Sequence, residues 1–305
     1  MYSTGSTNTH YLMGYFMNIS RSNIPVLSAI LFILSLFNPP AISMDDTVHF
    51  DLNYSPTWGS NHITVLGNGT QVQLLLDQQS GAGFNSKNKY GSGFFRLKMK
   101  MPNKKDAGVI TTFYLTGVPI DETNGGGHDE VDIEFLGSNG KPFILSTNVF
   151  ANDAGNREQQ FSLWFDPTED FHVYEILWNH HHIVFFVDKI PIRVYHNLKE
   201  RLGVNYPSRP MHVETSIWNF TSWLGPVDWS QAPFVSEYRG FGVDACVHES
   251  SDPRGCHSPK YYWNAPKYWK LGPIQQIFLH EHVRKNHMVY DYCADKKKHF
   301  IECNT

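Results

Sequence analysis

The sequence lacks two features that would each assign it to a familiar class of protein. It has no block of basic residues, and its 25 Lys and Arg against 29 Asp and Glu give a net charge of −4. This balance argues against nucleic acid as a partner. Its apolar run Val26–Phe37 has only 12 residues, whereas a transmembrane helix needs about 20. We therefore expect neither a nucleic-acid-binding protein nor an integral membrane protein.

The run Val26–Phe37 fits a signal peptide instead. A polar stretch containing Arg21 precedes the run, and the short segment Ala41–Ser43, with small residues, follows it. A charged region, a short apolar region and small residues before the cut are typical of a secretory signal. We expect cleavage near Ser43, so that residues 1–43 are the signal peptide and the secreted chain keeps no membrane segment.

Cysteine is absent from the first four fifths of the chain. The four cysteines are Cys246, Cys256, Cys293 and Cys303. In a secreted chain an even number of cysteines indicates disulfides, and four of them allow three pairings. A metal site is the alternative, but no Cys-x2-Cys spacing supports it. We therefore expect disulfides and no metal.

Aromatic residues, in contrast, are plentiful, with 21 Phe, 15 Tyr and 8 Trp making up 14% of the chain. Most of them would fill a β-rich core. A sugar-binding cleft would use others, because pyranose rings present apolar faces to aromatic side chains. Composition alone does not choose between these uses.

Short alternating apolar runs predict the fold. Gly, Pro, Asn and Asp separate these runs, a pattern typical of two antiparallel sheets packed as a sandwich. We expect an all-β domain over residues 44–240. Residues 241–305, with a helix over Pro273–Asn286, should form a C-terminal extension packed on it. The predicted strands are Ile63–Leu66, Val72–Leu76, Gly93–Met101, Val109–Thr116, Ile144–Phe150, Tyr174–Trp178, Ile183–Val187 and His212–Trp218.

The stretch His128–Gly137 carries the candidate chemistry. Polar and apolar residues alternate through it, which predicts a half-buried strand. Successive side chains of a strand point to opposite faces of the sheet. The two sets are Glu130, Asp132 and Glu134 on one face, and Val131, Ile133 and Phe135 on the other.

Two flanking carboxylates are what retaining glycoside hydrolysis needs, one as nucleophile and one as general acid and base. The Cα atoms of Glu130 and Glu134 would lie about 13 Å apart on a strand. Their side chains must therefore lean together to approach the ~5–5.5 Å that the mechanism requires. Asp132 can hydrogen-bond one of the two glutamates and keep that glutamate in its ionised form. A solvated strand face and a helix are the alternatives, but a helix would turn Asp132 away from the shared face.

The motif His-Asp-Glu-Val-Asp-Ile-Glu-Phe-Leu-Gly at 128–137 resembles the catalytic strand of xyloglucan endotransglucosylase/hydrolases, plant members of glycoside hydrolase family 16. Further similar segments are Ser146–Phe150, Gly155–Phe161, Leu163–Pro167 and Val227–Phe234. The resemblance implies a jelly-roll sandwich with a concave substrate cleft and a C-terminal extension that lengthens the acceptor side. It also implies the local disulfides Cys246–Cys256 and Cys293–Cys303.

The resemblance implies roles for individual residues as well. Glu130 would be the nucleophile and Glu134 the general acid and base, with Asp132 between them. The segment Asn156–Gln160 would bind sugar hydroxyls on the donor side, and Trp223 would be a platform beyond the cleavage point. The expected substrate-binding residues are Glu134, Ser146, Thr147, Asn148, Asn156, Arg157, Glu158, Ser222, Trp223 and Arg284.

The chain departs from the family at its glycosylation sequons. Many members carry a sequon just after the catalytic strand, whereas residues 138–141 contain none. Sequons do occur at Asn53, Asn68 and Asn219. Pro56 weakens the first, and the third falls where the family has cleft residues. We expect glycosylation at Asn68.

Together these observations predict a secreted, monomeric enzyme of the plant cell wall and apoplast that needs no cofactor. It would cleave the β-1,4-glucan backbone of xyloglucan and transfer the new end to another xyloglucan chain, to an oligosaccharide or to water. The closer alternative is an endohydrolase of another β-glucan. The alternative from a different class is a non-catalytic, lectin-like module, with Asp129, Glu130 and Asp132 as candidate calcium ligands.

Overall fold

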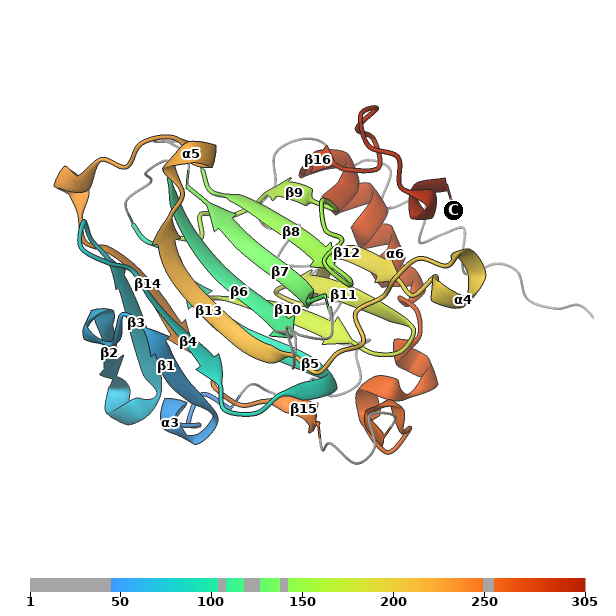
Figure 1. The fold of residues 1–305 in the computed structure, drawn as a ribbon, viewed down its shortest axis with the longest axis horizontal. Coiled ribbons are helices and arrows are strands. Elements are labelled where there is room, and N and C mark those ends of the chain that lie inside the picture. The colour runs from blue at the N-terminus through green and yellow to red at the C-terminus, as the bar shows by residue number, and fades with distance from the viewer. Residues whose placement is uncertain (1–44, 104–107, 118–126, 138–141, 249–254, 305) are drawn as a thin grey trace, which may run out of the picture. The chain divides into compact units, whose positions relative to one another are not determined.

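The computed structural model of this protein describes residues 45–103, 108–117, 127–137, 142–248 and 255–304. The expected signal peptide and the segment 138–141 lie outside the described residues. The described strands form two antiparallel sheets (Figure 1). One continuous set of buried apolar residues draws on the strands of both sheets, so the two sheets pack face to face as a sandwich. The predicted all-β class is confirmed.

The first sheet, here called the cleft sheet, carries the candidate site. Its strand order is β1-β4-β13-β6-β7-β8-β9-β16, and in Figure 1 its middle strands lie across the front. The sheet is built from segments far apart in the sequence, because β13 pairs with both β4 and β6. Its strands are β1 (Tyr54–Trp58), β4 (Ala82–Ser86), β6 (Val109–Gly117), β7 (Asp129–Leu136), β8 (Ile144–Phe150), β9 (Gln159–Ser162), β13 (His212–Asn219) and β16 (Met288–Asp291).

The second sheet, here called the outer sheet, backs the first. Its order is β12-β11-β10-β5-β14-β3-β2, and β15 pairs with β5. Its strands are β2 (Ile63–Leu66), β3 (Gln71–Leu76), β5 (Tyr90–Lys100), β10 (His172–Trp178), β11 (His182–Val187), β12 (Ile190–His196), β14 (Phe234–Arg239) and β15 (Asp244–Val247). Each predicted strand is present, with ends that differ by a few residues at most.

Helices are short and lie outside the sheets. The α-helices are α3 (Phe50–Asn53), α4 (Lys199–Leu202), α5 (Thr221–Leu224) and α6 (Pro273–Ile277), and the π-helix η8 (Phe278–Arg284) continues α6. The single-turn 3-10 helices are η1 (Ser60–His62), η2 (Gly67–Gly69), η4 (Trp229–Gln231), η5 (Gly255–His257), η6 (Tyr262–Asn264), η7 (Pro266–Tyr268) and η9 (Ile301–Asn304). The helix predicted over Pro273–Asn286 is thus present. No helix in the described ranges is long and apolar enough to cross a membrane.

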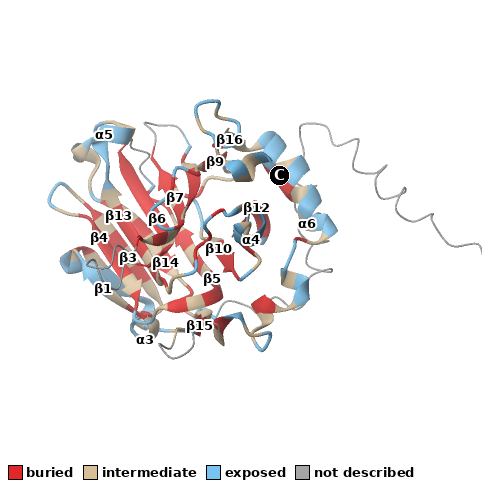
Figure 2. Cartoon of the chain, turned by 45° about the vertical axis from the view of Figure 1, so that its right-hand side comes forward, coloured by how far each residue is buried: buried red, intermediate tan, exposed pale blue. Residues whose placement is uncertain are grey.

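The core lies between the two sheets and fixes which face β7 turns to the cleft. Val131, Ile133 and Phe135 are fully buried, and the Phe135 ring meets the Tyr174 ring of β10 edge-on, with centroids 4.8 Å apart. Burying each such side chain stabilises the fold by roughly 1.5–3 kcal/mol. Figure 2 shows buried residues along the strands of both sheets. Because side chains alternate, this burial holds the β7 carboxylates on the opposite face.

The C-terminal extension joins both sheets. Its β15 adds to β5, and its β16 adds to β9 at the edge of the cleft sheet. The two local disulfides are present, as the family resemblance implied: Cys246–Cys256 and Cys293–Cys303.

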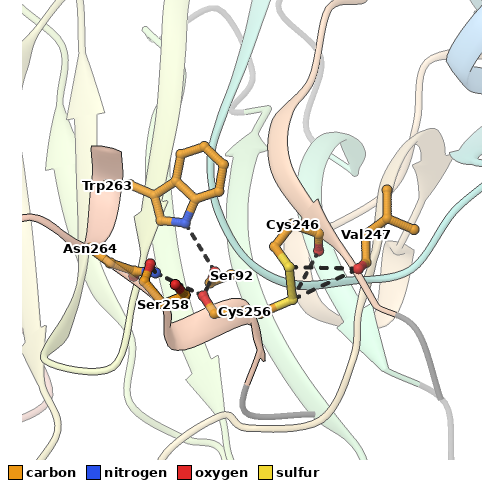
Figure 3. The surroundings of a disulfide bond; sticks show 7 residues. All are labelled: Ser92, Cys246, Val247, Cys256, Ser258, Trp263 and Asn264. Atoms are coloured by element: carbon orange, nitrogen blue, oxygen red, sulfur yellow. Dashed lines mark hydrogen bonds between the residues drawn. A yellow bond between two sulfur atoms is a disulfide. The ribbon is translucent and has the colours of Figure 1, made fainter. Parts of the chain in front are cut away.

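Figure 3 shows how the first disulfide is tied to the outer sheet. The hydroxyl of Ser92 on β5 donates to the Cys256 carbonyl at 2.6 Å and accepts from the Trp263 indole N–H at 3.0 Å. Asn264 donates to the same carbonyl at 2.8 Å. These buried bonds fasten the extension to the sandwich.

Candidate active site

The register of β7 with its neighbours builds the floor of the site. Residues directly opposite each other in an antiparallel pair point to the same face. On the cleft face, Glu130, Asp132 and Glu134 lie opposite Thr116, Tyr114 and Thr112 of β6, and opposite Phe150, Asn148 and Ser146 of β8. The carboxylates are therefore flanked by hydroxyl, amide and aromatic side chains.

Most of these side chains line a cleft of about 590 Å³. Glu130 and Glu134 are partly exposed in it, and Asp132 is buried between them. Tryptophan side chains from β1, β13 and α5 contribute to the walls. The lining residues are Trp58, Thr112, Tyr114, Glu130, Asp132, Glu134, Asn148, Phe150, Glu158, Ser216, Trp218 and Trp223.

Burial and mutual repulsion set the protonation of the carboxylates. Burial, and then the charges of Glu130 and Glu158, raise the pKa of Glu134 to about 7. Burial and the negative charges on both sides raise the pKa of Asp132 well above its usual range. Burial also raises the pKa of Glu130, but hydrogen bonds from Thr116 and Asp132 oppose this effect. The hydrogen bond between the two side chains therefore favours the ionised form of Glu130 and the protonated form of Asp132.

Neighbouring strands supply further polar contacts. Tyr114 donates to Glu214 of β13 at 2.9 Å, which places a fourth carboxylate beside the floor. The hydroxyl oxygens of Thr112 and Ser216 lie 2.8 Å apart, and the Ser216 N–H donates to Thr112 Oγ1 at 2.9 Å. These bonds link β6 to β13 across the cleft floor.

Asp129 fixes the start of β7. It is buried and points to the face opposite Glu130 and Asp132. The backbone N–H groups of Ser208 and Arg209 donate to its Oδ2 at 2.8 and 2.9 Å, and that of Asn152 donates to Oδ1 at 2.8 Å. Asp129, Glu130 and Asp132 therefore cannot ligate one calcium ion, which removes the ligand set of the lectin-like alternative.

The cleft does not receive all the residues expected to bind substrate. Glu134, Asn148, Glu158 and Trp223 line it, whereas Asn156 and Ser222 are exposed outside its lining. Ser146 faces Glu134 but is fully buried, and its hydroxyl has no hydrogen-bond partner among the described residues.

Three others turn away from the cleft. Thr147 lies on the inner face of the sheet, where its hydroxyl donates to the Gln159 carbonyl at 3.1 Å. Arg157 is buried and bonds Glu302 of the extension at 2.6 Å. Arg284 pairs with Asp291 at 2.8 Å. Thr147 and Arg157 are thus packing partners of the cleft sheet in this structure.

The extension and the segment Asn156–Gln160 meet at one edge of the cleft. Lys298 donates to Glu158 Oε2 at 2.7 Å and to the Asn156 carbonyl at 2.9 Å. The segment was expected on the donor side and the extension on the acceptor side. Because β16 pairs directly with β9, the segment and the extension lie side by side at this edge, and the sides expected for them stay predictions.

Comparison with known proteins identifies the family of this chain. The sequence profile of glycosyl hydrolases family 16 matches residues 50–232, and that of the xyloglucan endo-transglycosylase (XET) C-terminus matches residues 257–303. Xyloglucan endotransglucosylase/hydrolase protein 3 of Arabidopsis thaliana is 47% identical over 83% of this chain and 86% of its own length. The chain belongs to the xyloglucan endotransglucosylase/hydrolase branch of family 16.

Further members of this family are similar to the chain over most of their length. Xyloglucan endotransglucosylase/hydrolase protein 2 of Arabidopsis thaliana is 45% identical over 90% of this chain and 93% of its own length. Xyloglucan endotransglucosylase protein 2 of Diospyros kaki is 43% identical over 83% of this chain and 85% of its own. Strand β7 lies within the motif at residues 128–137, on which the resemblance to this family was first based.

Among solved structures, a prokaryotic β-1,3-1,4-glucanase (lichenase) from a mouse hindgut metagenome has a TM-score of 0.52 at 24% identity. The match covers 63% of this chain and 94% of that one. A β-glucanase of Bacillus licheniformis has a TM-score of 0.53 at 22% identity, over 64% and 92% of the two chains. This likeness confirms the jelly-roll fold.

The contacts of Asp129 lead to a stability prediction. Asp129→Ala leaves three partly buried backbone N–H groups without their acceptor, and an unsatisfied donor costs about 1–3 kcal/mol where it is buried. We expect urea denaturation to show a loss of at least about 2 kcal/mol in the free energy of unfolding. Asp153→Ala is the control, because within the described ranges that exposed side chain bonds only His128. Equal midpoints for the two variants would contradict the anchoring role.

Proposed function

We propose that this protein is a secreted, retaining, endo-acting enzyme that cleaves the β-1,4-glucan backbone of xyloglucan. It transfers the new end to another xyloglucan chain, to an oligosaccharide or to water. The observation that carries the proposal is the carboxylate row of β7 at the floor of an aromatic-walled cleft. The named relatives, xyloglucan endotransglucosylase/hydrolases, support the substrate.

In the first step, ionised Glu130 attacks the anomeric carbon while Glu134 gives its proton to the leaving glycosidic oxygen. The carbon–oxygen bond of the chain breaks, and an ester bond between the sugar and Glu130 forms. Glu134, now ionised, takes the proton of the incoming hydroxyl, whose oxygen displaces Glu130. The configuration at the anomeric carbon is retained. Asp132 keeps its own proton and holds Glu130 through their hydrogen bond.

The tryptophans support the binding of a long polymer. Trp58 and Trp223 are 42% and 47% exposed on the cleft wall, and solvated aromatic faces can stack on pyranose rings. They rise from β1 and α5, away from the edge that the extension occupies. The cleft thus has an aromatic part and a charged part, at Glu158 and Lys298, on different sides of the carboxylates.

Incubation of the secreted protein with xyloglucan and a labelled xyloglucan oligosaccharide tests the activity. We expect label in the polymer, together with a fall in polymer length. New reducing ends without labelled polymer would show hydrolysis as the reaction. Turnover of another β-glucan, with xyloglucan left intact, would replace the proposed substrate by that glucan.

Covalent labelling tests the nucleophile. A fluorosugar glycoside that forms a stable glycosyl-enzyme should add its mass to the wild-type protein at the peptide containing Glu130. In Glu130→Ala the adduct should be absent, because no carboxylate remains to form the ester. Glu214→Gln, which removes the carboxylate that Tyr114 bonds beside the floor, should still be labelled. Labelling of Glu130→Ala at undiminished yield would contradict the assignment of Glu130 as the nucleophile.

The raised pKa of Glu134 predicts the alkaline limb of the pH profile. The general acid must be protonated in the free enzyme, so kcat/KM should fall as the pH rises through about 7. With an aryl glycoside whose leaving group needs no proton, Glu134→Ala should retain formation of the glycosyl-enzyme and lose this limb. A limb that persists unchanged in the variant would assign it to another group.

We also propose that the chain is monomeric, acts in the cell wall and apoplast, and carries a glycan on Asn68. Asn68 is exposed in the turn η2. The Asn53 amide, in contrast, donates to the Phe241 carbonyl at 2.9 Å and is half-buried. Peptide mass analysis before and after enzymatic glycan removal tests the site, and an unmodified Asn68 in secreted protein would exclude it.

A further inference from the structure

Arg193 on β12 is a fully buried cation behind the catalytic strand. It is 2% exposed. Its Nη1 donates to the carbonyl and hydroxyl oxygens of Thr147 on β8, at 2.8 and 2.9 Å. Its Nη2 has no hydrogen-bond partner among the described residues. Arg193 therefore crosses from the outer sheet to the back of the cleft sheet.

The other contacts of Arg193 do not neutralise its charge. The guanidinium carbon lies 5.5 Å from the centroid of the Phe185 ring and 5.7 Å from that of Tyr292. No carboxylate of the described residues comes within 4.0 Å of it. An ionised group buried without a counter-charge is strongly unfavourable. We therefore expect a negative charge nearby to stabilise the buried guanidinium.

The nearby carboxylates outside the cleft floor each have a partner of their own. Glu302 accepts from Arg157 at 2.6 Å, Glu158 from Lys298 at 2.7 Å and Asp291 from Arg284 at 2.8 Å. Glu130, Asp132 and Glu134 are different, because none of them forms an ion pair with a Lys, Arg or His of the described chain. An unpaired cation and an unpaired set of anions thus lie in the same region.

Strand register brings the two together. Thr147, which holds the guanidinium, lies opposite Ile133, the residue between Asp132 and Glu134. Arg193 contacts the core-facing side of the cleft sheet. The carboxylates lie on the cleft-facing side of the same sheet. Charges on the two sides of the sheet interact strongly because the protein between them excludes water. In agreement, the charge of Arg193 lowers the pKa of Asp132 against the larger effects of burial and repulsion.

We propose that Arg193 is a positioning residue of the glycosidase reaction. Its charge, held behind Thr147, balances the negative charge of the β7 carboxylates and keeps the Glu130–Asp132 pair in the singly ionised form that attacks the sugar. This inference rests on the proposed function. The other titratable groups facing the two sites are Tyr195, Tyr292, Asp291 and Glu158 around Arg193, and His128, Tyr114, Glu134 and Glu214 around the pair.

The pH dependence of glycosyl-enzyme formation tests the proposal. Arg193→Met removes the charge and Arg193→Lys keeps it. In Arg193→Met the acidic limb of kcat/KM should move to higher pH by roughly half a unit or more, because ionising the pair becomes less favourable. Arg193→Lys should keep the limb near its wild-type position. Arg239→Met is the matched control, since that arginine of β14 bonds Gln71 and stacks on Phe171, away from the cleft.

A folded Arg193→Met variant whose acidic limb coincides with that of the wild type would overturn the proposal. If Arg193→Met does not fold, the double variant with Glu130→Gln should restore folding, because it removes the ionised carboxylate whose charge Arg193 no longer balances. Failure of that double variant to fold would also overturn it.

A second measurement needs no glucan turnover and so separates this inference from the proposed function. The double-mutant cycle of Arg193→Lys, Arg193→Met and Glu130→Gln is followed by urea denaturation. We expect Met in place of Lys at position 193 to destabilise the protein less in the presence of Glu130→Gln. Additive effects would contradict the charge balance, whereas coupling in a protein inactive on all glucans would refute only the proposed function.

Discussion

Repulsion among the three carboxylates on the cleft face of β7 is the constraint on which the rest of this site depends. Ionised side chains at Glu130, Asp132 and Glu134 would destabilise one another on a surface that is also largely withdrawn from water. The site resolves this by sharing protons. The pKa of Asp132 is raised well above its usual range, and that of Glu134 is raised to about 7, so both side chains favour their protonated forms. The same repulsion thus favours one ionised and one protonated glutamate, which the proposed roles of nucleophile and acid require.

The C-terminal extension takes part in this balance. It supplies Lys298 to Glu158 at the cleft edge and Glu302 to the buried Arg157. Both residues belong to the segment around the Cys293–Cys303 disulfide, so a short covalent loop holds an anion and a cation against the cleft sheet. Tyr292 of the same segment covers Arg193. The extension is therefore part of the electrostatic environment of the site, in addition to lengthening its sheet.

Local patterns predicted the elements with strong alternation and missed those without it. The strand β7 was predicted because Val131, Ile133 and Phe135 repeat at period two between acids. The strand β4, Ala-Gly-Phe-Asn-Ser, and the strand β9, Gln-Gln-Phe-Ser, contain too few apolar or β-branched residues to show that period. They are strands because neighbours on both sides pair with them, and that pairing is not visible in the local sequence.

The sequence by itself determined that three carboxylates share one face of a strand, because side-chain alternation is a property of the strand alone. It also determined the family, because its motifs are local. Only the tertiary structure decided which strands flank β7. That arrangement brings Tyr114, Glu214, Trp58 and Trp218 to the cleft and turns Thr147 and Arg157 away from it. Strand order and the place of a buried charge depend on contacts between distant segments, and no local pattern encodes them.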